Sequence, residues 1–565
     1  MAKVFGIDLG TTYSAIATLN ENGMPQVIKN DPDSTETLAS AVYFQPDGSP
    51  VVGAVAKEQA IIEPDRVVQF IKRDMGKSIE KRMFDGKGYD PIDISALILK
   101  RMKEYAEESL GEEVQDVIIT CPAYFGAEEK MATKQAGKAA GLNVLDIINE
   151  PTAAALNYCF KEHSENQRIM VYDLGGGTFD ITLLELTVDE NDKKAIIDVI
   201  GSKGNDSLGG INWDARLFEL ISSIYSDETN MDLDEEAQRR VKGDVEGIKK
   251  QLSRKDKHNL NIYSNGDSTR IAVTEAMFRE VTEDLTGQTI NLVNSVLAEN
   301  SLCPDDINTV LLVGGSTRMP MIKDAVESIF PGKVRVEEPD LAVAKGAALK
   351  AAYSLLERAE ELKEEVENAL SSGEELTEEE KKEAQELMEK ANEIQATLPS
   401  GIPVKRVSDI IPRAFGPAVL VGSELKINNL LFVGDKSPAE AIGEYGTHED
   451  NQPSVRIEIF ESLCSDRENE QFIDPPHDIY NNEQSTLPGV KQIGELSLPL
   501  APGTPAGSKI EVTFRYSEVG LEATAKDLRT GNVVDPVIVT KNIKSTEELQ
   551  SSSQYLSTVK TESDF

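Results

Sequence analysis

Two stretches of this sequence share one design. VFGIDLGTTYSAIATL, at residues 4–19, and VYDLGGGTFDITLLEL, at residues 171–186, each place an aspartate and a run of small residues between two apolar segments. Short apolar runs bounded by glycine are typical of buried strands. Each stretch therefore predicts a strand, a tight turn and a second strand, at residues 4–7 and 14–19 in the first copy and at residues 169–172 and 179–186 in the second.

The turns carry residues that suit a phosphate ligand. Glycines let the backbone approach closely and point consecutive N–H groups at phosphate oxygens, and Thr11, Thr12 and Thr178 add hydroxyl donors. Asp8 and Asp173 cannot bind phosphate themselves, but carboxylates can hold a hydrated magnesium ion. A single turn of this kind also occurs in ordinary hairpins. The second copy, 165 residues after the first, indicates two similar lobes that clamp a nucleotide and its metal.

A third glycine turn follows an apolar strand at residues 310–313. The turn, residues 314–318, reads GGSTR and precedes a helix-like stretch with Pro320 near its start, where proline is favoured. This turn is suited to the adenosine end of a nucleotide. The segment IKRDMGKS is not a P-loop, because Ile71 stands where that motif needs glycine.

Composition narrows the class of protein. The chain has 565 residues, 39% of them hydrophobic, which is enough for three or four ordinary domains with proper cores. Its formal net charge of -40 would repel nucleic-acid phosphates and anionic lipid. No apolar run reaches the length of a membrane helix, and the first strand begins too early for a signal peptide. We therefore expect a cytoplasmic protein that binds neither nucleic acid nor membrane. The cysteines have no CxxC pair and are expected to be reduced and buried: Cys121, Cys159, Cys303 and Cys464.

Six motifs, in this order along the chain, resemble one family: DLGTTYS, PAYF, NEPTAAAL, DLGGGTFD, LLVGGSTR and PDLAVAKGAA. They are similar to the nucleotide-binding domain of the DnaK-type seventy-kilodalton heat-shock chaperones, within the actin-like ATPase superfamily. This resemblance covers residues 1–352. Residues 409–540 resemble the family's peptide-binding β-sandwich through DIIPRAFG, EDNQPSVRIEIFE and SKIEVTFRYSEVGLEATAKD, and alternating apolar residues there also predict antiparallel strands.

The resemblance implies an ATPase, with ATP or ADP and Mg²⁺ as cofactors, that couples hydrolysis to the binding and release of unfolded or extended peptide segments. It assigns catalysis to Asp8, Lys72, Glu150, Asp173 and Thr178. Asp8, Glu150 and Asp173 would surround the water shell of the magnesium ion, and Lys72 would neutralise charge that develops on the phosphoryl oxygens. It assigns nucleotide binding to a larger set: Gly10, Thr11, Thr12, Tyr13, Gly175, Gly176, Gly177, Glu246, Lys249, Lys250, Ser253, Gly314, Gly315, Ser316, Arg318 and Asp340.

Further residues follow from the resemblance outside the nucleotide site. Tyr445, Val455 and Ile457 are candidates for the peptide cleft, although each also fits the core of a sandwich. Pro122 and Lys130 correspond to the family's interdomain relay, where Lys130 replaces an arginine and cannot form the same bidentate fork. The family also implies a J-domain co-chaperone and a nucleotide exchange factor as partners. Two departures weaken those partner assignments: Asp146 replaces the family's docking arginine, and the chain is some 25 residues shorter than typical relatives between Lys72 and Pro122.

Apolar residues between Leu355 and Leu398 recur at alternating spacings of three and four, with Ser371-Ser372-Gly373 between two such series. This pattern predicts two short helices joined by a turn, with Thr377 and Glu380 as a capping box for the second. The family offers no template for this hairpin. We expect it to replace the family's apolar linker as the coupling element, the alternative being two solvated helices without a function of their own.

The expected fold is an α/β actin-like (ribonuclease-H-like) two-lobed ATPase domain, then a helical hairpin and an all-β peptide-binding sandwich, without the family's helical lid. A metabolite kinase of the same superfamily, and a nucleotide-gated binding module with weak hydrolysis and a dedicated partner, remain as alternative functions. The expected boundaries are 1–354 for the ATPase domain, 355–398 for the hairpin, 399–412 for the linker, 409–540 for the sandwich and 541–565 for a flexible Ser/Thr-rich tail.

Overall fold

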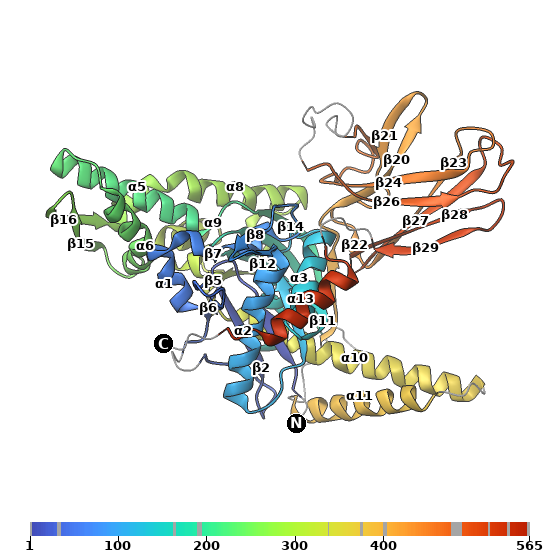
Figure 1. Cartoon of the computed structure of the whole chain (residues 1–565), viewed down its shortest axis with the longest axis horizontal. Helices are drawn as coiled ribbons and strands as arrows, with labels where there is room; N and C mark the ends of the chain where they lie inside the picture. The colour runs from blue at the N-terminus through green and yellow to red at the C-terminus, as the bar shows by residue number, and fades with distance from the viewer. Residues whose placement is uncertain are drawn as a thin grey trace.

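The structure is a computed structural model of the chain (Figure 1). It describes residues 3–30, 35–161, 165–188, 195–336, 338–372, 377–398, 404–475, 489–517, 520–538 and 543–561. Residues 399–403 of the expected linker and Gly373 of the expected hairpin turn lie outside the described residues. No helix within the described ranges is both long and apolar enough to span a membrane.

The first lobe, lobe I, is built on a sheet with the strand order β11-β10-β1-β2-β3. Strand β1 lies parallel to β10, which lies parallel to β11, whereas β2 and β3 continue the sheet in antiparallel fashion. The strands of this sheet are β1 (Phe5–Asp8), β2 (Tyr13–Leu19), β3 (Pro25–Val27), β10 (Asp116–Cys121) and β11 (Asn143–Asn149).

The second lobe, lobe II, repeats this arrangement. Its sheet begins β18-β17-β12-β13-β14, with β12 parallel to β17 and β17 parallel to β18, and with β13 and β14 antiparallel. The duplicated motif therefore forms the same central strand pair in each lobe, β1–β2 in one and β12–β13 in the other. The strands are β12 (Gln167–Leu174), β13 (Phe179–Val188), β14 (Ala195–Asn205), β17 (Thr309–Val313) and β18 (Val334–Val336).

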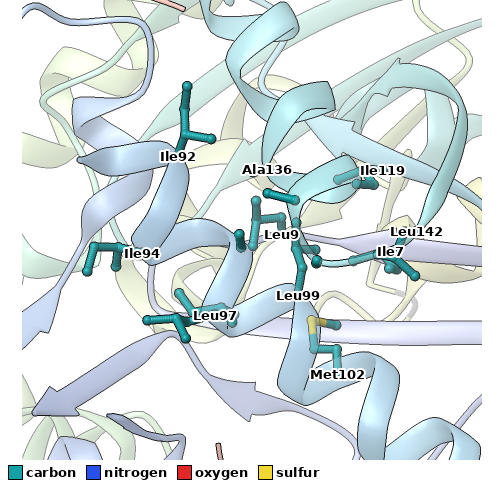
Figure 2. Close-up of a cluster of buried hydrophobic side chains, with 14 of the residues drawn as sticks. Ile7, Leu9, Ile92, Ile94, Leu97, Leu99, Met102, Ile119, Ala136 and Leu142 are labelled. Carbon is teal, nitrogen blue, oxygen red and sulfur yellow. The ribbon is translucent and has the colours of Figure 1, made fainter. Parts of the chain in front are cut away.

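Helices pack on both sheets. In lobe I, α2 (Pro91–Leu110) and α3 (Ala127–Ala139) cover one face, and Figure 2 shows Leu99 and Met102 of α2 in the same apolar cluster as Ile7 and Ile119 of the sheet. Between the lobes lie α4 (Glu150–Lys161) and the first part of α10 (Ala342–Ser372). Gly6 of β1 permits this packing, because an added Cβ would lie 2.0 Å from the backbone nitrogen of Ala348. Lobe II is covered by α8 (Glu283–Glu299) and α9 (Pro320–Ile329).

Each lobe carries an insertion at the mouth of the cleft between them. Helix α1 of the first insertion contacts α6 of the second, and Gly243 of α6 allows the close approach of Ile61. The insertion of lobe I contains β4 (Leu38–Ala39), β5 (Ala41–Phe44), β6 (Pro50–Val52), α1 (Ala54–Ile62), β7 (Val67–Gln69), β8 (Arg82–Phe84) and β9 (Lys87–Tyr89). That of lobe II contains α5 (Gly210–Thr229), α6 (Glu235–Leu252), β15 (Lys257–Ser264), β16 (Asp267–Thr274) and α7 (Glu275–Val281).

The region of the expected hairpin is not two short, separate helices. Its first half is the end of α10, a helix of 31 residues that begins between the lobes and continues outward, and α11 (Glu378–Thr397) packs beside it (Figure 1). Ala359 of α10 joins Ala391 and Ile394 of α11 in one buried cluster. Because α10 is anchored between the lobes, it needs no independent start at residue 355.

The linker contains a strand, which the sequence did not predict. Strand β19 (Val404–Ile410) adds to lobe II as a parallel neighbour of β14, with Val407 opposite Ile197. Its β-branched residues suit a strand, and Lys405 and Arg406 do not prevent one, because β22 pairs only with Asp409 and Ile410 and the start of β19 is open on that side. The linker is therefore part of the lobe II sheet, and the expectation that the hairpin displaces it is not supported by this arrangement.

After β19 the chain forms two antiparallel sheets, here called the paired sheets, around one core. Their orders are β25-β21-β20-β24-β26 and β23-β27-β28-β29, and Phe415, Ile459 and Phe514 are buried between them. Strand β22 (Lys436–Ser437) pairs with β19. The remaining strands are β20 (Ala414–Val421), β21 (Glu424–Asn428), β23 (Ala439–Gly446), β24 (Ser454–Ser462), β25 (Phe472–Ile473), β26 (Lys491–Pro499), β27 (Lys509–Ser517), β28 (Gly520–Asp527) and β29 (Val533–Ile538).

Residues 543–561 of the expected tail are not flexible, contrary to expectation, and residues 541–542 and 562–565 lie outside the described residues. Residues 546–558 form helix α13 (Thr546–Thr558), capped by Ser545 and lying on α3 beside α2 (Figure 1). Leu556 is buried in the core of lobe I. This helix cannot be predicted from its Ser/Thr-rich sequence, because it has few apolar side chains and is stabilised only when they pack on another surface. The cysteine expectation also needs one correction: Cys303 is exposed, and the other three cysteines are buried.

Candidate functional site

A cavity of about 1480 Å³ lies between the two lobes. All three glycine turns open into it, one from lobe I and two from lobe II. The cavity is lined by nearly every residue that the sequence assigned to nucleotide binding or catalysis: Asp8, Gly10, Thr11, Thr12, Tyr13, Lys72, Glu150, Asp173, Gly175, Gly176, Thr178, Glu246, Lys249, Lys250, Ser253, Gly314, Gly315, Ser316, Arg318 and Asp340. Gly177 is not among the lining residues, and its carbonyl accepts hydrogen bonds from Arg73.

The two phosphate-type turns face each other at close range. A Cβ added to Gly176 would lie 1.7 Å from the hydroxyl oxygen of Thr12, so only glycine fits there. A Cβ on Gly10 would lie 1.9 Å from the carbonyl oxygen of Tyr13. The Thr12 hydroxyl is buried and has no hydrogen-bond partner among the described residues. An unpaired donor between two glycine turns fits a ligand with several oxygen acceptors, such as a polyphosphate.

Lys72 lies among three carboxylates at the base of the cavity. Its side chain is 5% exposed and donates a hydrogen bond to Glu150. Burial alone would lower the pKa of Lys72, but the charges of Glu150 and Asp8 outweigh it and raise that pKa. Burial and the charge of Glu150 raise the pKa of Asp8 to about 7, and the pKa of Asp173 is raised well above its ordinary value by burial, Glu150 and Asp8.

The acidic group at the base fits a hydrated divalent cation. Three carboxylates with one lysine leave excess negative charge in a buried site, which a bound cation would neutralise. Within the described ranges, no three acidic, histidine or cysteine side chains converge closely enough to coordinate a metal directly. Asp8, Glu150 and Asp173 would therefore hold Mg²⁺ through its water shell, as Mg²⁺ commonly requires.

The opposite end of the cavity is lined by α6. Glu246 accepts hydrogen bonds from Lys57 and from the Tyr13 hydroxyl, the latter at 3.1 Å, and forms an ion pair of 2.7 Å with Lys250. Burial would raise the pKa of Glu246, but Lys57 and Lys250 lower it to about 2. Glu246 is therefore ionised at any physiological pH and connects lobe I to lobe II at the mouth of the cleft.

The remaining residues of this end are also fixed by hydrogen bonds. Lys249 is buried, lies 2.8 Å from Asp214 and donates to the carbonyl of Gly210 at 3.1 Å. The Ser253 hydroxyl, at the end of α6, donates to the carbonyl of Lys249 at 3.0 Å. Across the cavity the Arg318 guanidinium pairs with Asp340 at 2.7 Å, and the Ser316 hydroxyl donates to the carbonyl of Gly175 at 2.9 Å.

Four charged side chains are among the residues of this site that sequence reasoning missed. Lys57 and Asp214 line the cavity, Arg73 supports the turn of lobe II from lobe I, and Asp180 is completely buried beside the acidic group. Arg73 directly follows Lys72, and Asp180 is the last residue of DLGGGTFD, so the sequence held a signal for both. Lys57 and Asp214 have no local signal, because only the closing of the two insertions brings them to the cavity.

Lys130 lies at the junction of lobe I, β19 and the paired sheets. It is buried, and although burial would lower its pKa, Tyr516, Cys121, Asp409 and Asp146 outweigh that effect and raise the pKa. Those groups come from β27, lobe I and the end of β19, so the lysine joins all three parts. Asp146 is itself buried here, which leaves it unsuited to meet a partner protein at the surface. Pro122 is buried at the end of β10, whose last residue is Cys121.

The structure does not place the three candidate peptide residues in one open cleft. Ile457 is 5% exposed and belongs to the core between the paired sheets, so it does not present its side chain to a peptide. Tyr445 and Val455 are half-buried against the same core, and the Tyr445 hydroxyl accepts a hydrogen bond of 2.9 Å from the Asn428 side chain. Their alternation with polar neighbours could not distinguish a core face from a cleft.

Comparison with known protein families gives a match over both lobes. The family model described as Hsp70 protein matches residues 4–87 and 79–362, which is more than half of the chain. The matched region contains both lobes, all of the cavity-lining residues named above and the first part of α10.

Proposed function

The chain belongs to the Hsp70 family, and on that premise we propose that it is an ATP-driven chaperone in which the nucleotide cleft controls the binding and release of unfolded or extended peptide segments by the paired sheets. Family membership supports ATP binding with Mg²⁺, ATPase activity and a chaperone role in general. One observation carries the finer proposal: a buried lysine stands among three carboxylates between two opposed glycine turns, in a cleft whose two lobes also hold the paired sheets.

The residues of the cleft divide the work of phosphoryl transfer. Mg²⁺, when bound, would supply positive charge at the phosphoryl group. Asp8, Glu150 and Asp173 would hold the water shell of that ion, and Lys72 would neutralise charge on the phosphoryl oxygens. Thr178 would orient the attacking water, and Gly175 and Gly176 line the same part of the cavity.

The adenosine end needs positioning rather than chemistry. Glu246, Lys249, Lys250 and Ser253 present one face of α6 to the cavity, and the glycine turn at Gly314 approaches from the other side. An added Cβ on Gly314 would lie 2.3 Å from the carbonyl oxygen of Leu174, and its φ of 82° also favours glycine. Gly314 therefore lets this turn pack directly against the end of β12, and Gly314 and Gly315 line the cavity together with α6.

We propose the following division of the chain into domains. The nucleotide-binding ATPase domain is residues 1–354, the helical hairpin insertion is 355–398, the linker is 399–412, and the peptide-binding β-sandwich is 409–540. Clients are unfolded or extended polypeptides, and a J-domain co-chaperone and an exchange factor are proposed partners. Coupling between the domains is proposed to pass through Pro122, Lys130 and β19, where lobe I, lobe II and the paired sheets meet.

The first prediction tests the proposed function directly. Addition of an unfolded polypeptide, such as a reduced and carboxymethylated protein, is expected to raise the steady-state rate of ATP hydrolysis. The reason is that Lys130 and β19 connect the paired sheets to the two lobes that form the cleft. The measurement is phosphate release with and without peptide at saturating Mg-ATP. If the rate of ATP consumption rises with a small metabolite instead, and that metabolite becomes phosphorylated, the protein is a metabolite kinase.

The second prediction concerns pH and the contact between lobe I and the paired sheets. Glu461 of β24 is buried against Gly126, where an added Cβ would lie 3.3 Å from its Oε2 atom and 3.0 Å from Oε2 of Glu129. Neither Oε2 atom has a hydrogen-bond partner among the described residues. Burial and the nearby Glu129 raise the pKa of Glu461 to about 7, against the opposing effect of Lys491 and Arg413.

Docking of the paired sheets should therefore take up a proton. The ordinary pKa of a glutamate is about 4.5 and the docked value is about 7, so docking is most favourable below pH 4.5 and weakens as the pH rises to 7. Glu461→Gln is expected to remove this pH dependence and to strengthen docking at pH 8. Energy transfer between a dye on the exposed Cys303 and a dye on Ile442→Cys measures docking. The same slope between pH 5 and 7 in the variant would assign the proton to another group.

A further inference from the structure

The segment after the paired sheets returns to lobe I and is bound there by specific contacts. The Gln135 side chain of α3 both donates to the carbonyl of Lys544, at 2.7 Å, and accepts from its backbone N–H, at 2.8 Å. The ammonium group of Lys544, a residue 8% exposed, pairs with Asp93 at 3.1 Å and with Asp90. These two aspartates form the capping box of α2, so the lysine binds the positive end of that helix through its acidic cap.

Helix α13 continues the contact along lobe I. The Ser552 hydroxyl donates to Asp93 at 2.8 Å, and the Tyr555 and Tyr89 hydroxyls lie 2.9 Å apart. Leu556 is 1% exposed and packs in the core of lobe I together with residues of α2. Burial of this leucine removes apolar surface from water and stabilises the contact, a gain that a solvated tail would not have.

The end of the segment is also fixed. Thr561 is 0% exposed, its carbonyl accepts from the backbone N–H of Val52 at 3.3 Å, and its hydroxyl donates to Glu104. The segment 543–561 is thus held at its start by α3 and α2, in its middle by the lobe I core, and at its end by β6 and α2. We call this segment the C-terminal anchor.

The anchor and β19 hold the paired sheets from two different lobes. Strand β19 belongs to the lobe II sheet, and only residues 411–413 separate it from β20. At the other end, residues 539–542 separate β29 from the anchor on lobe I. Because a chain spans at most about 3.6 Å per residue, the four connecting residues keep the end of β29 within about 20 Å of the start of the anchor while the anchor is bound.

From this geometry we infer that the C-terminal anchor keeps the paired sheets docked across both lobes in the ATP state and in the ADP state. Opening or closing of the cleft then shifts and strains the docked sheets instead of releasing them. The inference rests on the proposed function only where nucleotide is concerned, since the anchor and its contacts with lobe I exist without a ligand.

The test uses the dye pair on Cys303 and Ile442→Cys in the full chain. Energy transfer is expected to show one docked population without nucleotide, with ATP and with ADP. Removal of the anchor, in a chain ending at residue 542, is expected to raise the undocked fraction about tenfold or more, because an intramolecular tether acts at an effective concentration in the millimolar range. A synthetic peptide of residues 543–561 alone cannot re-tether the sheets, but it should bind the shortened chain in a labelled-peptide assay.

Removal of the anchor uncovers Leu556's site in lobe I, so a milder variant keeps the test informative. Gln135→Ala combined with Lys544→Met removes the hydrogen bonds and the charge and keeps the apolar packing, and it should also raise the undocked fraction. Gln554→Ala, at an exposed position of α13, is the matched control and should behave as wild type. An undocked fraction in wild type with ADP that equals that of the shortened chain would overturn the inference. If the wild-type chain does not hydrolyse ATP but its paired sheets stay docked, the proposed function is overturned and the inference about the anchor is retained.

Discussion

Replacement of Lys72 with alanine is expected to lower ATP turnover by about 100- to 1000-fold while nucleotide still binds. Lys72 is the one lysine that donates a hydrogen bond to Glu150 in the described cleft, and its positive charge is held in place by burial and by the carboxylates around it. The positive charge of Lys72 is therefore already in position before the substrate binds, and no reorganisation is needed when it stabilises the transition state. Binding of the nucleotide depends instead on the glycine turns and on α6, which the substitution leaves intact.

The measurements for this variant separate chemistry from binding. Single-turnover hydrolysis gives the rate of the chemical step, and displacement of a fluorescent ATP analogue gives the dissociation constant. Lys138→Ala, at an exposed position on α3, is the matched control and should hydrolyse ATP at the wild-type rate. The Lys72→Ala substitution removes the positive charge that compensates the buried carboxylates. Thermal unfolding with and without Mg²⁺ therefore checks that the variant is folded. Turnover within a few-fold of wild type would remove Lys72 from the transition state.

The two lobes were predictable because their signals are local and duplicated. Each Asp-Leu-Gly stretch carries its own apolar strands and its own turn, and the structure gives both copies the same sheet order. The resemblance to the heat-shock family, confirmed by the family match, also rests on short motifs. Such features can be recognised without knowledge of the rest of the fold, since a strand pair and its turn depend on neighbouring residues.

The features that were missed depend on contacts between distant parts of the chain. Helix α13 carries few apolar residues and is stabilised by lobe I, and β19 forms because an open edge of β14 accepts it. In the same way Lys57 reaches the cleft only because α1 packs on α6. Periodicity within one segment cannot reveal a partner hundreds of residues away, and it cannot tell whether Ile457 faces a core or a cleft.

Gly176→Ala is expected to weaken nucleotide binding by about 10- to 100-fold, because overpacking in a close-packed site costs about 1–3 kcal/mol. The new methyl group would lie 1.7 Å from the Thr12 hydroxyl oxygen and 2.8 Å from its Cβ, so the turn of lobe I or the turn of lobe II must move. Either movement separates the two sets of phosphate donors. Gly287→Ala, in helix α8 where nothing lies within 4 Å, is the matched control and should leave binding unchanged.

A double-mutant cycle shows whether the two turns act as one site. Thr12→Ala removes the nearest clashing atom, the hydroxyl oxygen, and should recover part of the affinity that Gly176→Ala loses, although the remaining Cβ contact at 2.8 Å still costs some binding. A positive coupling between the substitutions, measured by calorimetry with ADP, is the expected result, since the residues belong to different lobes and meet only across the cleft. Purely additive losses would mean that the turns bind nucleotide independently, and the duplication would then reflect only a repeated fold and not one shared phosphate clamp.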